Sequence, residues 1–492
     1  MARIAKVIDL PSIMKLNKAD GQITTQLIHI LREAVQKGDL HSGDPLPSSR
    51  ELAQTLGIAR GTIIEAYDQL IAEGVLEARS RQGTFVSHAL KCSSPQTAST
   101  HQIDAEFLTD AARTYAEIFK EFKPLAHRPF AISVPTGRTQ PSDVWRKFGN
   151  RFRARGVAAP SGYDDPQGVY ALRSAIAGYV RRSRSVQCEP EQIVITSGIQ
   201  QALYLCGQIL FTNHDSVWIE DPAYRGTTAI LENSLHHLQI TRVPVDEEGI
   251  QVQKGIELAP HARAAFVTPS HQYPLGMPMS WAQRNKLIEW AKQQRTWIVE
   301  DDYDSELRYT GQPFPALQGM APDQVIYLGT FSKVLFPSLR LGYAVLPKVL
   351  VAPFCGLRAL IDRHPPSADQ HVLAAFIQEG YLERHIRRIR NVYAENRQQI
   401  IQLIDRYIPK QYAFIESGDQ GMHMVLWLTA SADDLKIAKI ALEAGVSVKA
   451  VSPTFSQARK RPGLILGLGD FDLNQLERAI QILSEVIQTC LN

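Results

Sequence analysis

The sequence predicts an α/β protein with three parts: a small N-terminal module of winged helix-turn-helix type, a large domain with a mostly parallel sheet, and a small C-terminal α+β lobe. Two short helical patterns joined by a Leu-Gly-Ile turn stand near the N-terminus. Short apolar runs then alternate with helical stretches, as in βαβ units. Beyond about residue 411, strand and helix patterns of a smaller lobe follow.

Length and composition set the class of protein. The chain has 492 residues, 44% hydrophobic and 21% charged, which indicates several folded units and excludes a disordered or collagen-like chain. A formal charge of +3 is too small to indicate nucleic acid or membrane by itself. The five cysteines show no spacing typical of a disulfide framework or a metal site. Without a signal-like or membrane-length apolar segment, the sequence predicts a cytoplasmic protein.

A helix-turn-helix is predicted near the N-terminus. An amphipathic helix over 23–38 comes first. Ser48 then stands three residues before Glu51, the spacing of a capping box at a helix start. Gly57 allows a left-handed stop, and the next apolar stripe begins at Arg60.

A hairpin and a linker follow these helices. The runs VLEA and TFVS flank a polar connection that contains Gly83, which predicts a wing. The sequence then becomes aperiodic and rich in Ser and Thr. We therefore expect an N-terminal module over 20–88, a linker over 89–124 and an effector domain over 125–492. The helical stretch Ala105 to Phe122 fits either side of that last boundary.

Residues at the start of the second helix of the helix-turn-helix are suited to reading DNA. That helix enters the major groove in such modules. Arg60 offers guanine a bidentate contact, Gly61 allows close approach, and Thr62 reaches a phosphate or a thymine methyl. The other DNA-contacting candidates lie on the preceding helix and on the wing: Arg50, Arg79, Arg81 and Gly83.

The charge balance of this module predicts weak binding by a single copy. Residues 1–90 hold ten Lys or Arg and ten Asp or Glu, so two copies on one site are expected. A winged fold used for protein contacts is the alternative. The run from ITTQLIHIL to RQGTFV, with LPSSRELA, R-x-T before A-Y and G-T-F-V, resembles the GntR-type winged helix. That resemblance implies that Arg50, Arg60, Thr62 and Gly83 contact DNA.

Polar residues that follow apolar strand runs form a second candidate site, because ligands of open parallel sheets lie beyond the carboxyl ends of strands. Ser-Gly-Ile-Gln after IVIT is suited to holding a phosphate at a helix start. Further polar residues follow VWIE, WIVE and VIYLG. The candidates are Ser197, Gly198, Ile199, Tyr224, Asp301, Tyr303, Thr330, Ser332, Lys333 and Arg340.

The chemistry of this set matches pyridoxal 5'-phosphate. Lys333 fits the Schiff base with an aldehyde, Asp301 the pyridine nitrogen, and Tyr303 the ring oxygen. A stacking ring and phosphate ligands complete the set: Tyr224 for the ring, and Ser197, Gly198, Thr330, Ser332 and Arg340 for the phosphate. Each residue alone also fits a solvated loop, a helix cap or ordinary packing, and their joint order favours a site.

The motifs SGIQQAL, DPAY, TPSHQYPLG, EDDYDSELRY and GTFSKVLFPSLRLGY are similar to those of fold-type I aminotransferases. A GntR-like reader joined to such a domain resembles the MocR family of regulators, with its GabR-like and PdxR-like subgroups. The resemblance implies a head-to-tail homodimer, a Schiff base at Lys333, and binding of a double-stranded DNA operator under control of the cofactor or of a small amine.

Two departures from the aminotransferase pattern favour regulation over catalysis. Tyr273 stands where those enzymes commonly hold an Asn, and GLILG at 463–467 lacks their carboxylate-binding arginine, with Arg459 and Arg461 only nearby. We expect at most residual transaminase activity. The first hypothesis is a regulator of vitamin B6 or amino-acid metabolism genes that senses pyridoxal phosphate or an amino compound forming an aldimine. The alternative is an active aminotransferase with an appended DNA-binding module.

Overall fold

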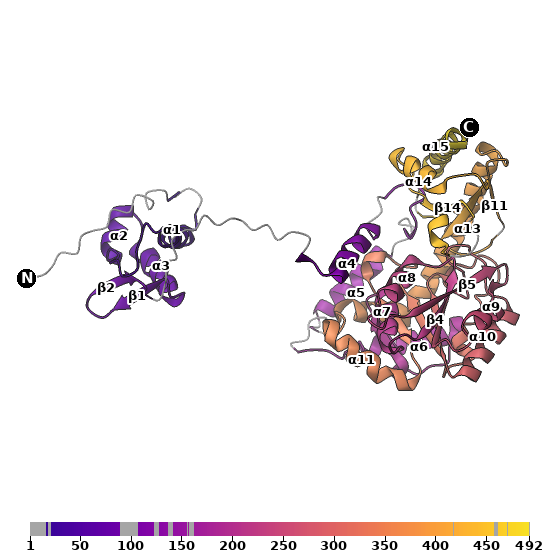
Figure 1. Cartoon of the computed structure of the whole chain (residues 1–492), viewed down its shortest axis with the longest axis horizontal. Helices are drawn as coiled ribbons and strands as arrows, with labels where there is room; N and C mark the ends of the chain where they lie inside the picture. The colour runs from indigo at the N-terminus through magenta and orange to yellow at the C-terminus, as the bar shows by residue number, and fades with distance from the viewer. Residues whose placement is uncertain are drawn as a thin grey trace, which may run out of the picture. The chain divides into compact units, whose positions relative to one another are not determined.

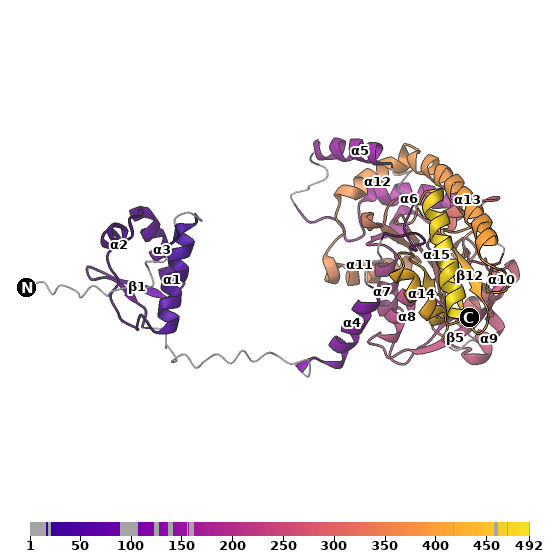
Figure 2. The same cartoon turned by 90° about the horizontal axis from the view of Figure 1, so that it is seen from above.

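A computed structural model describes residues 16–17, 21–88, 107–122, 127–135, 141–154, 156, 162–416, 418–456, 461–469 and 471–491. The chain divides into two units, Met1–Glu117 and Ile118–Asn492 (Figures 1 and 2). None of the helices in the described ranges is long and apolar enough to cross a membrane.

The N-terminal module contains the predicted helix-turn-helix and wing. Its elements are α1 (Ile23–Lys37), α2 (Ser49–Leu56), α3 (Arg60–Ala72), β1 (Leu76–Arg79) and β2 (Gly83–Val86). Apolar side chains from all three helices meet in one buried core, including Leu27, Leu31, Leu52, Ile63 and Leu70. The two strands pair antiparallel, with Arg79 opposite Gly83, so Gly83 begins the second strand.

Local hydrogen bonds set the start and the end of α2. The Ser48 hydroxyl accepts from the Glu51 backbone N–H at 3.3 Å, and Glu51 Oε2 accepts from the Ser48 N–H at 2.9 Å. Gly57 ends the helix with a φ of 60°, a conformation that costs glycine little because it lacks a Cβ. The predicted capping box and left-handed stop are therefore confirmed.

An eight-stranded sheet organises the large unit, in the order β3-β10-β9-β8-β7-β4-β5-β6. Neighbours from β9 through β5 run parallel, whereas β10 runs antiparallel to both β3 and β9. The strands are β3 (Ile193–Thr196), β4 (Ser216–Asp221), β5 (Gln239–Asp246), β6 (Gly249–Ile250), β7 (Ala264–Val267), β8 (Trp297–Asp302), β9 (Val325–Thr330) and β10 (Gly342–Val345). All five predicted strand runs are present.

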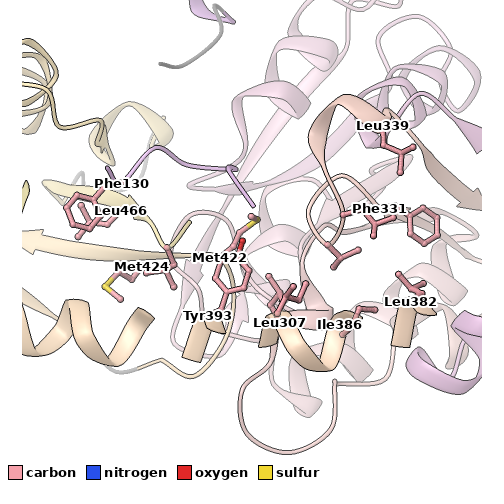
Figure 3. Close-up of a cluster of buried hydrophobic side chains, with 14 of the residues drawn as sticks. Phe130, Leu307, Phe331, Leu339, Leu382, Ile386, Tyr393, Met422, Met424 and Leu466 are labelled. Atoms are coloured by element: carbon pink, nitrogen blue, oxygen red, sulfur yellow. The ribbon is translucent and has the colours of Figure 1, made fainter. Parts of the chain in front are cut away.

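Helices cover the sheet, and apolar clusters fill the space between them. These helices are α5 (Ser142–Ala154), α6 (Tyr170–Arg184), α7 (Ile199–Ile209), α8 (Arg225–Glu232), α9 (Val252–Leu258), α10 (Trp281–Gln294), α11 (Lys348–Asp362), α12 (Ala368–Gln378) and α13 (Tyr381–Tyr407). The largest cluster joins segments far apart in sequence: Phe130, Leu307, Tyr393 and Leu466 belong to it (Figure 3).

The C-terminal lobe is the predicted α+β unit. Its four antiparallel strands have the order β11-β12-β14-β13, and α14 (Asp434–Glu443) and α15 (Leu473–Leu491) pack beside them (Figure 1). The strands are β11 (Ala413–Ile415), β12 (His423–Leu428), β13 (Lys449–Ala450) and β14 (Gly463–Gly467). This lobe therefore brings β12 and β13 toward the large sheet's ligand edge, where His423 contacts the loop after β7 through Pro274.

One helix lies inside the predicted linker. α4 (Asp110–Glu121) falls within 89–124 and has no buried residue. At its end, Glu121 forms an ion pair with Arg225 at the start of α8, with 2.7 Å between Oε2 and Nε. The last turn of α4 is thus fastened to the large unit.

The capping box predicts a local stability effect. Replacing Ser48 with Ala removes the acceptor for the Glu51 N–H and costs about 1 kcal/mol, so backbone amides of α2 should exchange with solvent about fivefold faster. Hydrogen exchange followed by mass spectrometry measures this. The neighbouring Ser49→Ala variant removes a hydroxyl that does not cap the helix, and exchange in α2 as fast as in Ser48→Ala would contradict the assignment.

Candidate functional site

The predicted ligand-binding residues follow strand ends that meet at one edge of the sheet. β4, β8 and β9 run parallel, and β3 has the same direction because β10 is antiparallel to both β3 and β9. Their carboxyl ends therefore face the same side, where ligands of open α/β sheets bind. Ser197, Tyr224, Asp301 and Lys333 all come from this edge.

Asp301 and Lys333 form the electrostatic centre of the site. Burial lowers the pKa of the Lys333 ammonium to about 8, and the nearby Asp304 and Asp301 carboxylates offset part of that effect. Burial, together with the nearby Asp302 charge, raises the pKa of Asp301 to about 8, and the positive charge of Lys333 offsets part of the increase. Asp301 Oδ1 is buried and has no hydrogen-bond partner. A lysine whose proton is lost more easily than usual and an unpaired carboxyl oxygen are thus held at one site.

A cradle for an anion lies at the start of α7. Arg340 donates from Nη2 to the Ser197 carbonyl at 2.7 Å, and a Cβ on Gly198 would lie only 3.4 Å from Arg340 Nη1. Gly198 has a φ of 81°, which a side chain would also strain. The buried Ser332 hydroxyl has no partner, while its backbone N–H donates to Thr330 Oγ1 at 3.1 Å. α7 begins at Ile199, and the backbone N–H groups of its first turn have no acceptor within the helix.

Tyr224 directly precedes α8 and faces the same centre. Burial and the nearby Asp301 charge raise the pKa of its phenol to about 12. Its hydroxyl donates to Gln200 Oε1 at 3.3 Å, and its ring meets Tyr273 edge-on at 5.6 Å between centroids. The ring is therefore held in place beside Asp301, as stacking on a ligand requires.

A buried group that the sequence analysis missed lies next to Tyr303. His271 Nδ1 is 3.0 Å from Asp304 Oδ1 and 2.9 Å from the Tyr303 hydroxyl. His423 lies with its ring centroid 5.1 Å from that of His271, and its Nε2 contacts the Pro274 carbonyl at 3.0 Å. Ligand-type atoms of both histidines and Asp304 lie within 4.8 Å of one another, but hydrogen bonds already engage them.

The segment 463–467, in which the sequence analysis found no carboxylate-binding arginine, forms the buried strand β14. Ile465 of β14 is fully buried in a cluster with Val425, Trp427 and Val451. Arg461 pairs with Glu416 at 2.6 Å, and its guanidinium lies 3.8 Å from the centroid of the Trp427 ring. Arg459 lies outside the described residues. Arg461 is thus engaged elsewhere and does not supply the missing clamp.

The DNA-contacting candidates lie mainly on the surface of the N-terminal module. Arg50, Arg60 and Arg81 are exposed, and Arg60 Nε donates to the Ser49 hydroxyl at 3.3 Å. Gly61 is exposed and Thr62 is half-buried at the start of α3. Gly83 is exposed in the wing. Arg79 is the least free: it pairs with Glu77 at 2.5 Å and lies over the Phe85 ring.

The donor set fits pyridoxal phosphate. The cofactor's aldehyde needs a neutral amine, its pyridine nitrogen needs a carboxylate, and its phosphate needs hydroxyl, guanidinium and backbone donors. Lys333, the unpaired Asp301 Oδ1, the unpaired Ser332 Oγ and the Arg340 guanidinium match these needs in turn. Two buried polar atoms without partners at the two ends of one site are the observation that a missing ligand explains.

Comparison with known proteins agrees with this architecture. The model for aminotransferase class I and II matches residues 130–461, and the model for bacterial regulatory proteins of the gntR family matches residues 23–86. The chain is 34% identical over 94% of its length to the probable rhizopine catabolism regulatory protein MocR of Rhizobium meliloti, of which 94% is covered. The chain belongs to the MocR family of transcriptional regulators. The family prediction is confirmed.

Two further comparisons concern the relatives of this MocR-family chain and its fold. It is 32% identical, over 97% of its length and 99% of the relative, to the pyridoxine biosynthesis transcriptional regulator PdxR of Corynebacterium glutamicum. The α-aminoadipate aminotransferase LysN of Thermus thermophilus, solved in complex with N-(5'-phosphopyridoxyl)-L-leucine, superimposes with a TM-score of 0.70. It is 25% identical and covers 78% of this chain and 98% of its own. These likenesses support the predicted fold class and the pyridoxal phosphate prediction.

The lowered pKa of Lys333 predicts how the cofactor attaches. Only the neutral amine attacks an aldehyde, so the rate of covalent attachment of pyridoxal phosphate to the cofactor-free protein should rise as pH increases through about 8 and then level off. An exposed lysine would keep rising to a pH near 10. Stopped-flow absorbance measures the rate. Covalent uptake that persists in the Lys333→Ala variant would show that another lysine carries the cofactor.

Proposed function

We propose that this MocR-family chain is a pyridoxal-phosphate-dependent regulator that binds a double-stranded operator as a homodimer in the cytoplasm. Its signal is the cofactor itself or an amino compound that reacts with it, and its targets are genes of vitamin B6 or amino-acid metabolism. The observation that carries the proposal is the pairing, in one chain, of an exposed Arg60 on a winged helix-turn-helix with the unpaired Asp301 Oδ1 beside Lys333.

The charges of the site explain why the cofactor binds. Asp301 is buried close to Asp302, so its carboxylate is costly as long as no positive charge faces it. A protonated pyridine nitrogen supplies that charge and keeps the ring electron-withdrawing. In the same way, the phosphate neutralises Arg340 and gives Ser332 Oγ and the first N–H groups of α7 an acceptor. Lys333 would supply the amine that the aldehyde of the cofactor needs.

The apolar wall beside the site favours sensing over transamination. Amino-acid substrates bring a carboxylate, and burying it against Ile465 without a guanidinium partner costs several kcal/mol. The cofactor, or an amine that lacks a tightly bound carboxylate, avoids that cost. Rapid multiple-turnover transfer of amino groups from ordinary amino acids would instead support an active aminotransferase.

Two copies of the N-terminal module on one operator follow from its charge. The module has no excess of positive charge in residues 1–90, so few phosphate contacts come from one copy. A dimer presents two recognition helices to two half-sites and combines their affinities. The large unit is the part of the chain that would hold the two modules together.

The linker helix gives the site a route to the N-terminal module. Arg225 follows Tyr224 directly, and it pairs with Glu121 at the end of α4 and with Glu232 on α8. Lys449 of β13 also lies near Glu121. Its positive charge lowers the pKa of Glu121, and the Glu121 charge raises the pKa of Lys449. A shift of Tyr224 on ligand binding therefore changes the support of the helix that leads to the module.

Operator binding should depend on Arg60. Replacing Arg60 with Ala removes from each subunit a bidentate contact to a base, worth about 1–3 kcal/mol, so operator affinity should fall about 5- to 150-fold for each half-site. The test is fluorescence anisotropy at fixed salt on DNA from upstream of its own gene, with and without pyridoxal phosphate. Lys37→Ala removes the same charge from the end of α1, where Lys37 pairs with Glu33, and serves as the control. Unchanged affinity in the Arg60→Ala variant would remove the regulatory hypothesis.

The ion pair of the linker helix should matter for the response to the cofactor. Glu121→Gln removes from each subunit a half-exposed ion pair worth under about 1 kcal/mol, so in the proposed dimer the ratio of operator affinities with and without pyridoxal phosphate should move toward one by up to about 25-fold. Asp110→Asn removes a carboxylate at the other end of α4, where it pairs only locally with Arg113, and is the control. A wild-type ratio in the Glu121→Gln variant would show that this contact carries no signal.

A further inference from the structure

Three segments place a histidine and a carboxylate against the Tyr303 hydroxyl. His271 follows β7, while Tyr303 and Asp304 follow β8, and the Met422 N–H at the start of the C-terminal lobe donates to Asp304 Oδ2 at 3.2 Å. His271 Nδ1 lies 3.0 and 3.1 Å from the two Asp304 oxygens and 2.9 Å from the Tyr303 oxygen. His271 and Asp304 are both buried.

The position of the imidazole proton of His271 decides whether the Tyr303 hydroxyl can donate to it. A lone pair on His271 Nδ1 would face two lone-pair-bearing Asp304 oxygens in a buried site, which is unfavourable. Nδ1 therefore carries the proton and donates it to Asp304. A protonated Nδ1 cannot accept from Tyr303. The phenolic proton of Tyr303 is consequently free to point toward a different acceptor.

The Tyr303 phenol keeps that proton over the whole physiological range. Burial raises its pKa well above the ordinary value, and neighbouring charges raise it further. The titratable groups that face it are Asp304, Tyr273, Asp301 and Glu220. Tyr303 is thus a hydrogen-bond donor, and the question is where its proton goes.

The His271 ring is held in one orientation. A Cβ on Gly421 would lie 2.0 Å from His271 Cε1, and a Cβ on Gly276 would lie 3.2 Å from Nε2. The two glycines therefore form a slot that the imidazole fills. The His423 ring closes another side. His271 has no room to turn and present its other nitrogen to Tyr303.

We propose that His271 is a positioning residue that, held by Asp304, directs the Tyr303 proton away from itself and toward the ring oxygen of bound pyridoxal phosphate. The inference rests on the proposed function, because it needs the cofactor next to Tyr303. It assigns a role to two residues that touch no part of the cofactor and act only through the phenol.

A donor on the ring oxygen has a spectroscopic consequence. It stabilises negative charge on that oxygen and lowers the pKa of the proton that the oxygen shares with the Lys333 nitrogen. Without the donor, the pH at which the visible absorbance of the bound cofactor changes should rise by about one unit. Tyr303→Phe gives this shift directly. Asp304→Asn should reproduce it with Tyr303 still present, because an uncharged amide no longer holds the proton on Nδ1, and an unprotonated Nδ1 can accept the Tyr303 hydroxyl proton.

The experiment is an absorbance titration of the full-length, cofactor-loaded protein and its variants. His236→Asn, which keeps a donor for the Gln208 carbonyl near the far end of α7, is the control and should titrate like the wild type. His271→Gln keeps an N–H for Asp304 and should retain the wild-type midpoint, whereas His271→Leu leaves Asp304 to draw the Tyr303 proton and should raise it. If Asp304→Asn does not fold, the comparison of His271→Gln with His271→Leu tests whether His271 directs the Tyr303 proton.

A wild-type midpoint in both Asp304→Asn and His271→Leu, together with a raised midpoint in Tyr303→Phe, would overturn the role of His271. A midpoint that Tyr303→Phe leaves unchanged has a different meaning. It would show that the cofactor does not face Tyr303, and it would count against the cofactor site of the proposed function itself.

Discussion

The different treatment of two adjacent carboxylates at the end of β8 is the constraint on which the site depends. Asp302 Oδ2 accepts from Arg184 Nε at 2.8 Å and from the Tyr327 hydroxyl, and the Asp302 and Arg184 side chains are almost fully buried. Neighbouring strand residues point to opposite faces, so Asp301 cannot share these partners. Asp302 is paired with Arg184 through Oδ2, although its Oδ1 has no partner, whereas Asp301 is the carboxylate that we propose meets the cofactor.

The Arg184 ion pair also explains how the sheet tolerates so much buried charge. Arg184 ends α6 and reaches Asp302, the Ser270 hydroxyl and the Phe314 carbonyl, so it fastens a helix, a strand end and two loops. Removing one partner of such a pair leaves an uncompensated charge and costs several kcal/mol. The rigid support behind β8 is what holds Asp301 in place before a ligand arrives, which lowers the free energy that ligand binding must spend on ordering the site.

Sequence predicts those parts of this molecule that local interactions determine. The capping box at Ser48, the stop at Gly57 and the five apolar strand runs were predictable because each pattern lies within a few residues. β5 and β10 were not predicted. β5 is largely half-exposed, with Thr, Arg and Pro in its sequence, and β10 has only four residues. Neither strand forms an apolar run that differs clearly from the sequence on either side of it, so the search for apolar runs did not find them.

The candidate site divides in the same way. Residues with a motif of their own, such as Lys333 and Asp301, were predicted, and the structure places them at one edge of the sheet. His271 and His423 were missed because their contact depends on the packing of the loop after β7 against β12 of another lobe. Two buried histidines 152 positions apart carry no local signal. Only tertiary structure reveals them.

The size of the contacts around the linker limits what kind of switch this chain can be. A ligand shifts an equilibrium only by its unequal affinity for two states, and a half-exposed ion pair such as Glu121–Arg225 contributes under about 1 kcal/mol, or a factor of about five. In the proposed homodimer, two subunits that change together would multiply this to about 25-fold in operator affinity. That is enough to alter the occupancy of one promoter, and it requires both copies to act together. An N-terminal module with balanced charge suits this arrangement. If one copy bound DNA tightly by itself, the loss of the second copy's contacts would change operator occupancy little.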